Sequence, residues 1–145
     1  MITLSKRRKM CYFYFECVGE MKIKLEDYFS FENDIFFETD DVVNNLNEEF
    51  VLEGENYLNH VGIDTSNIYF KLLAQLYFLK DKNITDNSSL AHINYIIAYY
   101  VGLFLHPING ELIALKFIDE AIGLENDNSK IEKYKELKAM IKEEL

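Results

Sequence analysis

Carboxylates are the most abundant chemically active side chains in this chain, and they are concentrated in one segment. Between Leu25 and Phe70 the sequence holds twelve Asp and Glu residues and no Lys or Arg. Carboxylates can ligate Ca²⁺, but the Asx-rich turns at 81–87 and 125–129 lack the central Gly and the ligand spacing of an EF-hand loop. We interpret those turns as helix caps. The acidic segment therefore favours an anionic binding surface.

Histidine and cysteine show no metal-binding or nucleophile motif. His60, His92 and His106 lie 32 and 14 positions apart, and none has a second ligand-type residue at helical spacing on the same face. We expect His92 to be a hydrogen-bonded core or rim residue and His106 to cap a helix end. Cys11 and Cys17 form no disulfide framework, no Ser is flanked by Gly, and the six Gly residues are isolated. We therefore expect a protein that is not an enzyme and needs no metal or cofactor.

Length and charge narrow the class of protein further. A chain of 145 residues is expected to form a single domain. Its net charge of −10 and pI near 4.7 repel phosphate backbones and anionic lipids, which argues against nucleic-acid and membrane partners. The apolar stretch at 10–18 is interrupted by Glu16 and is not followed by a small-residue cleavage site, so we expect a cytoplasmic protein. The apolar run Leu90–Leu105 is too short to span a membrane and is soon followed by Pro107.

Hydrophobic periodicity predicts a mainly α fold, a compact bundle or orthogonal array of about five helices, with the helical core at about 40–145. The third helix, from Ser88 to Leu105, is apolar on nearly every face and should be central. A capping box of Ser129 and Glu132 predicts the start of the last helix. The other helices are expected at 40–62, 67–80 and 111–122. Ahead of them, 11–26 fits a short N-terminal hairpin, and 27–39 fits irregular chain or a short strand at 35–37.

The first predicted helix carries carboxylates along one side. Its apolar side centres near Leu46 and Phe50, and acidic residues recur every seven positions on the opposite side, around a single leucine. A merely solvated helix face usually mixes Lys with Glu, as the last predicted helix does. The absence of cations favours a binding surface over a solvated face. The residues expected to bind a partner are Asp41, Glu48, Glu49, Leu52 and Glu55.

A second pattern spans the third and fourth predicted helices. Gly102, Ala114 and Ala121 have the spacing of the small residues in a tetratricopeptide repeat, and the stretch resembles one such repeat. The resemblance implies a helical hairpin used for protein contacts, with no catalytic residues. Ala98 and Leu105 stand where the repeat has aromatic residues, and a generic antiparallel helix pair also needs small residues where its helices cross.

In size, acidity and Lys-rich, Arg-poor composition the chain resembles the small immunity proteins that neutralise bacterial toxins, many of which are nucleases with cationic clefts. The resemblance implies a cytoplasmic protein-binding inhibitor that occludes the active site of a basic, nuclease-type toxin with its carboxylates. The alternative is a helical adaptor or regulatory protein-interaction module without a toxin partner. A small enzyme is a third alternative, and it would need a cleft with convergent polar groups.

Translation could start at Met1 or at Met21, and residues 1–20 contain both Cys and both Arg of the chain. If Met21 is the start, deleting residues 1–20 should leave the melting temperature nearly unchanged, because a peripheral hairpin adds little to a helical core. Thermal denaturation of the two forms measures this. A loss of about 1 kcal/mol or more, which is several degrees for a domain of this size, would contradict the prediction.

Overall fold

The computed structural model describes residues 23–30, 32–82 and 86–144, and these form helices without any strand. The mainly α fold predicted from the sequence is confirmed. The helices are α2 (Leu25–Tyr28), α3 (Thr39–Asn45), α4 (Glu48–Val61), α5 (Ser66–Asp81), α6 (Asn87–Tyr100) with its π-helical continuation η1 (Val101–Leu105), α7 (Gly110–Leu124) and α8 (Asn128–Glu143).

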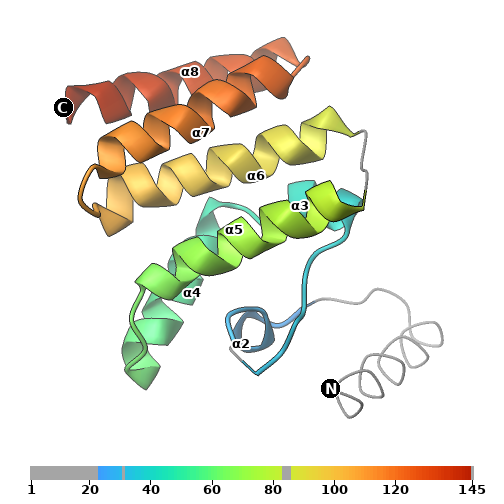
Figure 1. The fold of residues 1–145 in the computed structure, drawn as a ribbon, viewed down its shortest axis with the longest axis vertical. Coiled ribbons are helices and arrows are strands. Elements are labelled where there is room, and N and C mark those ends of the chain that lie inside the picture. The colour runs from blue at the N-terminus through green and yellow to red at the C-terminus, as the bar shows by residue number, and fades with distance from the viewer. Residues whose placement is uncertain (1–22, 31, 83–85, 145) are drawn as a thin grey trace.

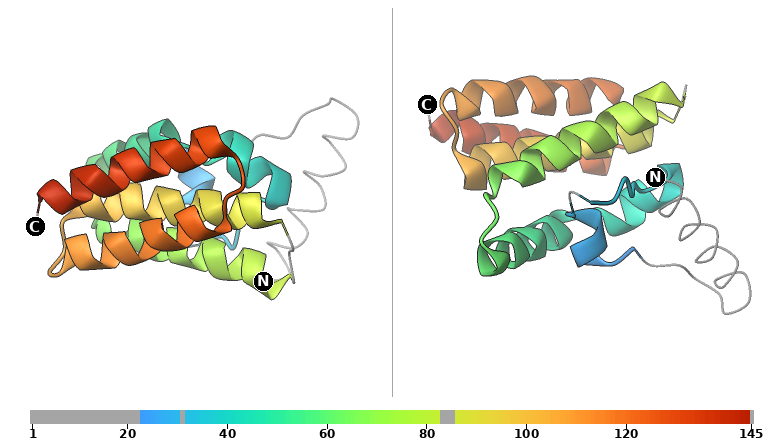
Figure 2. Two further views of the ribbon diagram at one scale, coloured as in Figure 1. Left: turned by 90° about the horizontal axis from the view of Figure 1, so that it is seen from above. Right: turned by 60° about the horizontal axis from the view of Figure 1, so that its bottom comes forward.

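The helices are arranged in two parts. Helices α5 to α8 run antiparallel, and each packs against the next (Figure 1). Helices α3 and α4 follow one another along the chain, and both contact α6. Figure 2 shows α2, α3 and α4 as a layer of their own, across from α5 to α8. Helix α6 contacts α3, α4, α5 and α7, so it lies at the centre of the fold, as predicted.

Helix α6 is central because its sequence is apolar in every direction. All residues from Ile93 to Ala98 are buried, and so are Tyr100 and Val101. The helix continues into η1, where the His106 backbone N–H donates to the Val101 carbonyl at 3.2 Å, and it ends just before Pro107, whose ring cannot continue a helix.

Small residues allow α6 and η1 to approach their neighbours closely. A Cβ atom placed on Gly102 would lie 2.9 Å from Cγ1 of Ile141 on α8 and 3.1 Å from Cβ of Ala114 on α7. Both distances are shorter than ordinary van der Waals contact, so no larger residue fits at 102 without a shift. Gly102 and Ala114, two of the three small residues that resemble a tetratricopeptide repeat, therefore meet at a helix crossing.

The single helix predicted at 40–62 is wrong, because the structure divides it into α3 and α4. Leu46 is buried at the break, and the next residue, Asn47, is the N-cap of α4. The Asn47 side chain accepts a hydrogen bond from the Phe50 backbone N–H at 2.9 Å. The side chain of an Asn can accept the hydrogen bond of a backbone N–H in the first turn of a helix, which would otherwise have no partner. Asn47 therefore marks the start of a new helix.

Other predicted helix boundaries also differ from the structure, by one to three residues or more. The capping box at Ser129 is wrong, because the N-cap of α8 is Asp127, two residues earlier, whose side chain accepts the Ser129 backbone N–H at 2.9 Å. Most of the predicted N-terminal hairpin lies outside the described residues. Its last residues, Leu25 and Glu26, begin α2 instead of ending a strand.

The extended segment before α3 is held by a buried glutamine rather than by a sheet. The Gln75 side chain on α5 accepts from the Phe37 backbone N–H at 2.9 Å and donates to the Phe37 carbonyl at 3.0 Å. Its Oε1 also accepts from the Tyr28 hydroxyl at 2.8 Å. Nearby, Lys71 donates to the Ile35 carbonyl at 2.6 Å. These bonds attach the segment, and α2 with it, to α5, so the core reaches back to Tyr28.

Replacing Gln75 with Leu should destabilise the protein strongly. The variant leaves the Phe37 N–H and C=O and the Tyr28 hydroxyl buried without partners, and each such group costs about 1–3 kcal/mol. We expect the free energy of unfolding, measured in urea, to fall by about 3 kcal/mol or more.

Tyr28→Phe is the matched control, because it removes one of these bonds and leaves the Phe37 backbone paired. It should cost about 1 kcal/mol. If Gln75→Leu costs no more than Tyr28→Phe, the glutamine does not hold this segment.

Candidate functional site

The exposed acidic surface of α3 and α4 is the first candidate site. It consists of Asp40 and Asp41 on α3 with Glu49 and Glu53 on α4, all of them exposed, and we call it the α3–α4 acidic surface. Three of the four lie in the first turn of their helix, where the positive end of the helix dipole stabilises a carboxylate. Glu53 lies beyond the first turn of α4, so the helix dipole does not stabilise its carboxylate in the same way.

Two of the predicted site residues, Asp41 and Glu49, belong to this surface. The other three predicted residues, Glu48, Leu52 and Glu55, are less exposed. Leu52 and Glu55 are half-buried at the edge of α4, because the inward face of this helix consists of Val51, Gly54 and Leu58. Gly54 lies directly against the Phe29 ring, where a Cβ atom would not fit. The inward face is thus rotated from the one predicted around Leu46 and Phe50, and the seven-residue stripe does not run along one continuous helix.

Glu48 does not face outward, and its predicted orientation is wrong. Its Oε2 lies 3.0 Å from Nζ of Lys133 on α8 and accepts a hydrogen bond from the Tyr95 hydroxyl on α6 at 3.2 Å. Its side chain is 29% exposed. The carboxylate therefore bridges α4, α6 and α8, and its charge is balanced within the protein.

The surroundings of Glu48 favour an ionised Glu48 carboxylate and a neutral Tyr95 hydroxyl. Burial opposes ionisation of Glu48, but the hydrogen bond and charge of Lys133, together with hydrogen bonds from the Glu48 backbone N–H and the Tyr95 hydroxyl, outweigh it and lower the pKa of the carboxyl. Burial and the neighbouring Glu48 raise the pKa of the Tyr95 hydroxyl. The Tyr95 ring stacks on Tyr134 at 4.8 Å, with Lys133 Nζ 4.9 Å from its centroid. Both pKa values move away from neutral pH, whereas a general acid or base works best with a pKa near it. These directions fit a structural role for the Glu48–Tyr95 contact.

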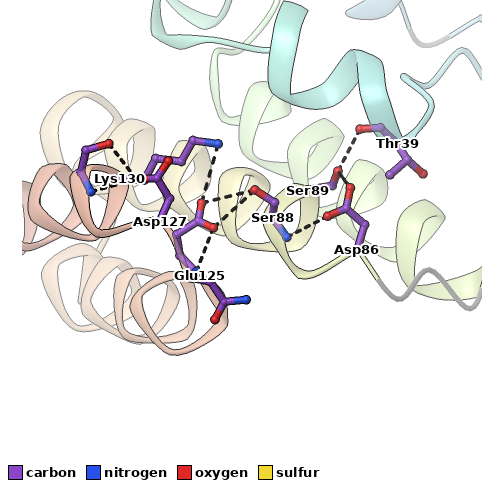
Figure 3. A network of polar contacts seen from close by, with 9 residues as sticks. Thr39, Asp86, Ser88, Ser89, Glu125, Asp127 and Lys130 are labelled. Carbon is purple, nitrogen blue, oxygen red and sulfur yellow. Dashed lines mark hydrogen bonds and ion pairs between the residues drawn. The ribbon is translucent and has the colours of Figure 1, made fainter.

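A second polar cluster joins the ends of three helices (Figure 3). Glu125, buried at the end of α7, accepts from Ser88 Oγ on α6 at 3.3 Å and from the Asn126 backbone N–H at 3.1 Å, and Lys130 on α8 lies 3.9 Å away. Beside it, Ser89 Oγ donates to the Thr39 carbonyl of α3 at 2.9 Å. Among the described residues no buried side-chain nitrogen or oxygen lacks a hydrogen-bond partner, so these contacts serve to fix the helix ends.

The three histidines have different environments. His60 is exposed on the last turn of α4. Nε2 of His92 lies 2.6 Å from the Leu46 carbonyl at the break between α3 and α4, which fits the predicted core or rim role. His106 is the C-cap of η1, as predicted, and it lies near the carboxylates of Glu111 and Glu144. Sequence spacing could not find this group, because Glu144 is contributed by another helix.

The surface also has an open hollow of about 550 Å³ beside α5. The hollow is lined by Phe36, Ala74, Tyr77, Phe78, Lys80 and Asp81. These residues are mostly apolar, and they bring no nucleophile together with a base. Among the described residues we therefore find no catalytic constellation in this hollow.

Comparison of the chain with known protein families, with curated proteins and with solved structures finds no match in any of the three. Within the described residues one helical stretch, Asn87–Leu105, is long and apolar enough to cross a membrane by length and composition alone. Most of that stretch is buried by the other helices, which is also typical of a core helix.

His92 makes stability depend on pH. Burial lowers its pKa below the ordinary 6.5, more than the Leu46 carbonyl and Glu48 raise it. Below pH 6.5 the unfolded chain therefore binds a proton that the folded chain resists, so the free energy of unfolding falls as the pH falls from about 7 through the lowered pKa.

Urea unfolding at pH 7 and pH 5.5 measures this loss, which should be on the order of 1 kcal/mol. His92→Gln can still donate to the Leu46 carbonyl but does not titrate, so its loss over the same interval should be smaller. His60→Gln, at an exposed site, is the control and should behave like the wild type. Equal losses in all three proteins would contradict the assignment.

Proposed function

We propose that this protein is a protein-binding inhibitor and that its partner is a basic protein. The kind of inhibitor that fits best is an immunity protein that acts in the cytoplasm and neutralises a nuclease-type bacterial toxin. In this proposal the protein has no catalytic activity of its own and needs no cofactor, and the α3–α4 acidic surface is its binding face.

The observation that carries the proposal is the charge of that surface. Within the described residues two of the twelve carboxylates of the 25–70 segment form ion pairs, Glu38 with Lys82 and Glu48 with Lys133. Asp41, Glu49 and Glu53 are exposed and form no such pair with the described residues. A one-signed surface of this kind attracts a cationic partner over a distance and repels nucleic acid.

Inhibition would follow from occlusion. A nuclease cleft is cationic because it binds phosphates, and carboxylates at the right spacing can occupy the same positions. Charge complementarity raises the association rate and disfavours wrong partners, while contacts at the centre of the interface set the dissociation rate. Leu52, half-buried at the edge of α4, is the apolar side chain that we place at that centre.

A second candidate function is a helical adaptor, and the exposed apolar residues at the start of α7 favour it. Ile108 is 92% exposed and Leu112 is 59% exposed, beside the crossing at which Gly102 meets Ala114. Exposed apolar side chains that gather at one end of a helical hairpin are typical of a protein contact.

Charge reversal on the α3–α4 acidic surface tests the proposal. Asp41, Glu49 and Glu53 are all replaced by Lys, and the variant is compared with wild type for binding to the protein captured from the source cell. We expect slower association and a flatter salt dependence in stopped-flow measurements, because rim charges act mainly on the encounter rate. Circular dichroism checks that the helices are retained.

The matched control reverses Glu132, Glu136 and Glu143 on α8, which are exposed and alternate with lysines. The change in net charge is the same, but association should change much less. If both triple variants weaken partner binding equally, binding depends only on the net charge of the protein, and the α3–α4 acidic surface is not a specific site. Binding that neither triple alters, but that Ile108→Ser with Leu112→Ser weakens, would favour the adaptor.

A further inference from the structure

Three side chains able to ligate a metal converge at the end of the fold where η1 turns into α7. They are His106, the C-cap of η1; Glu111, in the first turn of α7; and Glu144, the C-cap of α8. One ligand atom from each lies within 4.8 Å of those from the other two. We propose that His106, Glu111 and Glu144 bind a divalent transition-metal ion such as Zn²⁺.

The donor set selects the kind of metal. An imidazole nitrogen with two carboxylate oxygens suits Zn²⁺ and its neighbours in the first transition row, whereas Mg²⁺ and Ca²⁺ take sets made of oxygen only. Ligand atoms around a tetrahedral Zn²⁺ lie about 3.4 Å apart, given bonds of about 2.0–2.1 Å. His106 and Glu144 are exposed, so rotation of their side chains can close the difference.

Electrostatics favours a cation at this position. Two carboxylates approach each other here, and none of the ion pairs formed by described residues involves Glu111 or Glu144. Like charges at short distance repel, and a dication between them converts the repulsion into attraction. The imidazole adds a neutral donor and no further negative charge.

A bound ion would connect three elements of the fold. The three ligands come from η1, α7 and α8, so the ion would tie the end of the last helix to the turn between η1 and α7. Three protein ligands leave a fourth position for water or for a group from a partner. This site lies on elements other than α3 and α4, and its test does not depend on the proposed function.

Binding of Co²⁺ and Zn²⁺ to the full chain tests the proposal. Calorimetry with Zn²⁺ should show one site, and Co²⁺ should give a visible d–d spectrum without the charge-transfer band of a thiolate ligand. That band separates this site from one formed by Cys11 and Cys17, the two thiols of the chain. Zn²⁺ should also raise the melting temperature, since a ligand that binds only the folded state stabilises it, and Mg²⁺ should not.

Three variants locate the site. Glu111→Gln and Glu144→Gln keep the side-chain shape and remove the charge. His106→Asn removes the imidazole and suits the backbone, because His106 has φ of 47° and Asn tolerates that left-handed conformation better than most residues. Each variant should weaken Zn²⁺ binding at least about tenfold.

His60→Asn and Glu143→Gln are the matched controls, because they remove an exposed histidine and an exposed carboxylate from outside the cluster. Both should bind Zn²⁺ as the wild type does. Unchanged binding in His106→Asn, a thiolate band with Co²⁺, or no saturable binding by the wild type would each overturn the proposal.

Discussion

The rest of the structure depends on the burial of α6. A helix that is apolar on every face cannot lie on a surface, so other helices must cover it from several sides. Helices α5 and α7 flank it, and α3 and α4 cover it from the other layer. The apolar surface that α6 removes from water therefore accounts for the two-part arrangement of the whole chain.

The polar side chains of α6 decide how the covering elements are placed. Burial alone is non-directional and would allow α3 and α4 to slide. Ser89 bonds to Thr39 of α3, His92 to Leu46 at the break, Tyr95 to Glu48 of α4, and Tyr100 to the Thr65 carbonyl before α5. Each of these groups would be left buried without a partner if its neighbour moved by one turn, which specifies one register.

The sequence could predict the helices of this fold but not the break within the first one. Apolar residues at helical spacing run through 43–50 without interruption, because α3 and α4 turn their apolar faces toward the same core. Periodicity therefore reports burial and not continuity of the backbone. The residues that do mark the break are Asn47 and the two glutamates after it, an N-cap followed by an acidic first turn. Gln75 left no such signal, because its partners at Phe37 are backbone atoms 38 positions away.

The same distinction between local and distant partners applies to the candidate site. The exposure of Asp41 and Glu49 could be predicted from the helical periodicity of the residues around them in the sequence. The orientation of Glu48 depends on Tyr95 and on Lys133, which belong to other helices, and no pattern within 40–62 contains that information.

The lysines that pair with carboxylates of the 25–70 segment do not lie on the α3–α4 acidic surface. Lys82, the C-cap of α5, pairs with Glu38, and Lys133 on α8 pairs with Glu48. Within the described residues the exposed carboxylates of α3 and α4 form no ion pair, and an excess of like charge costs stability. Solubility alone does not require that cost, since α8 achieves a charged surface by alternating Lys with Glu. In the function proposed above, a cationic partner would turn this repulsion between like charges into attraction.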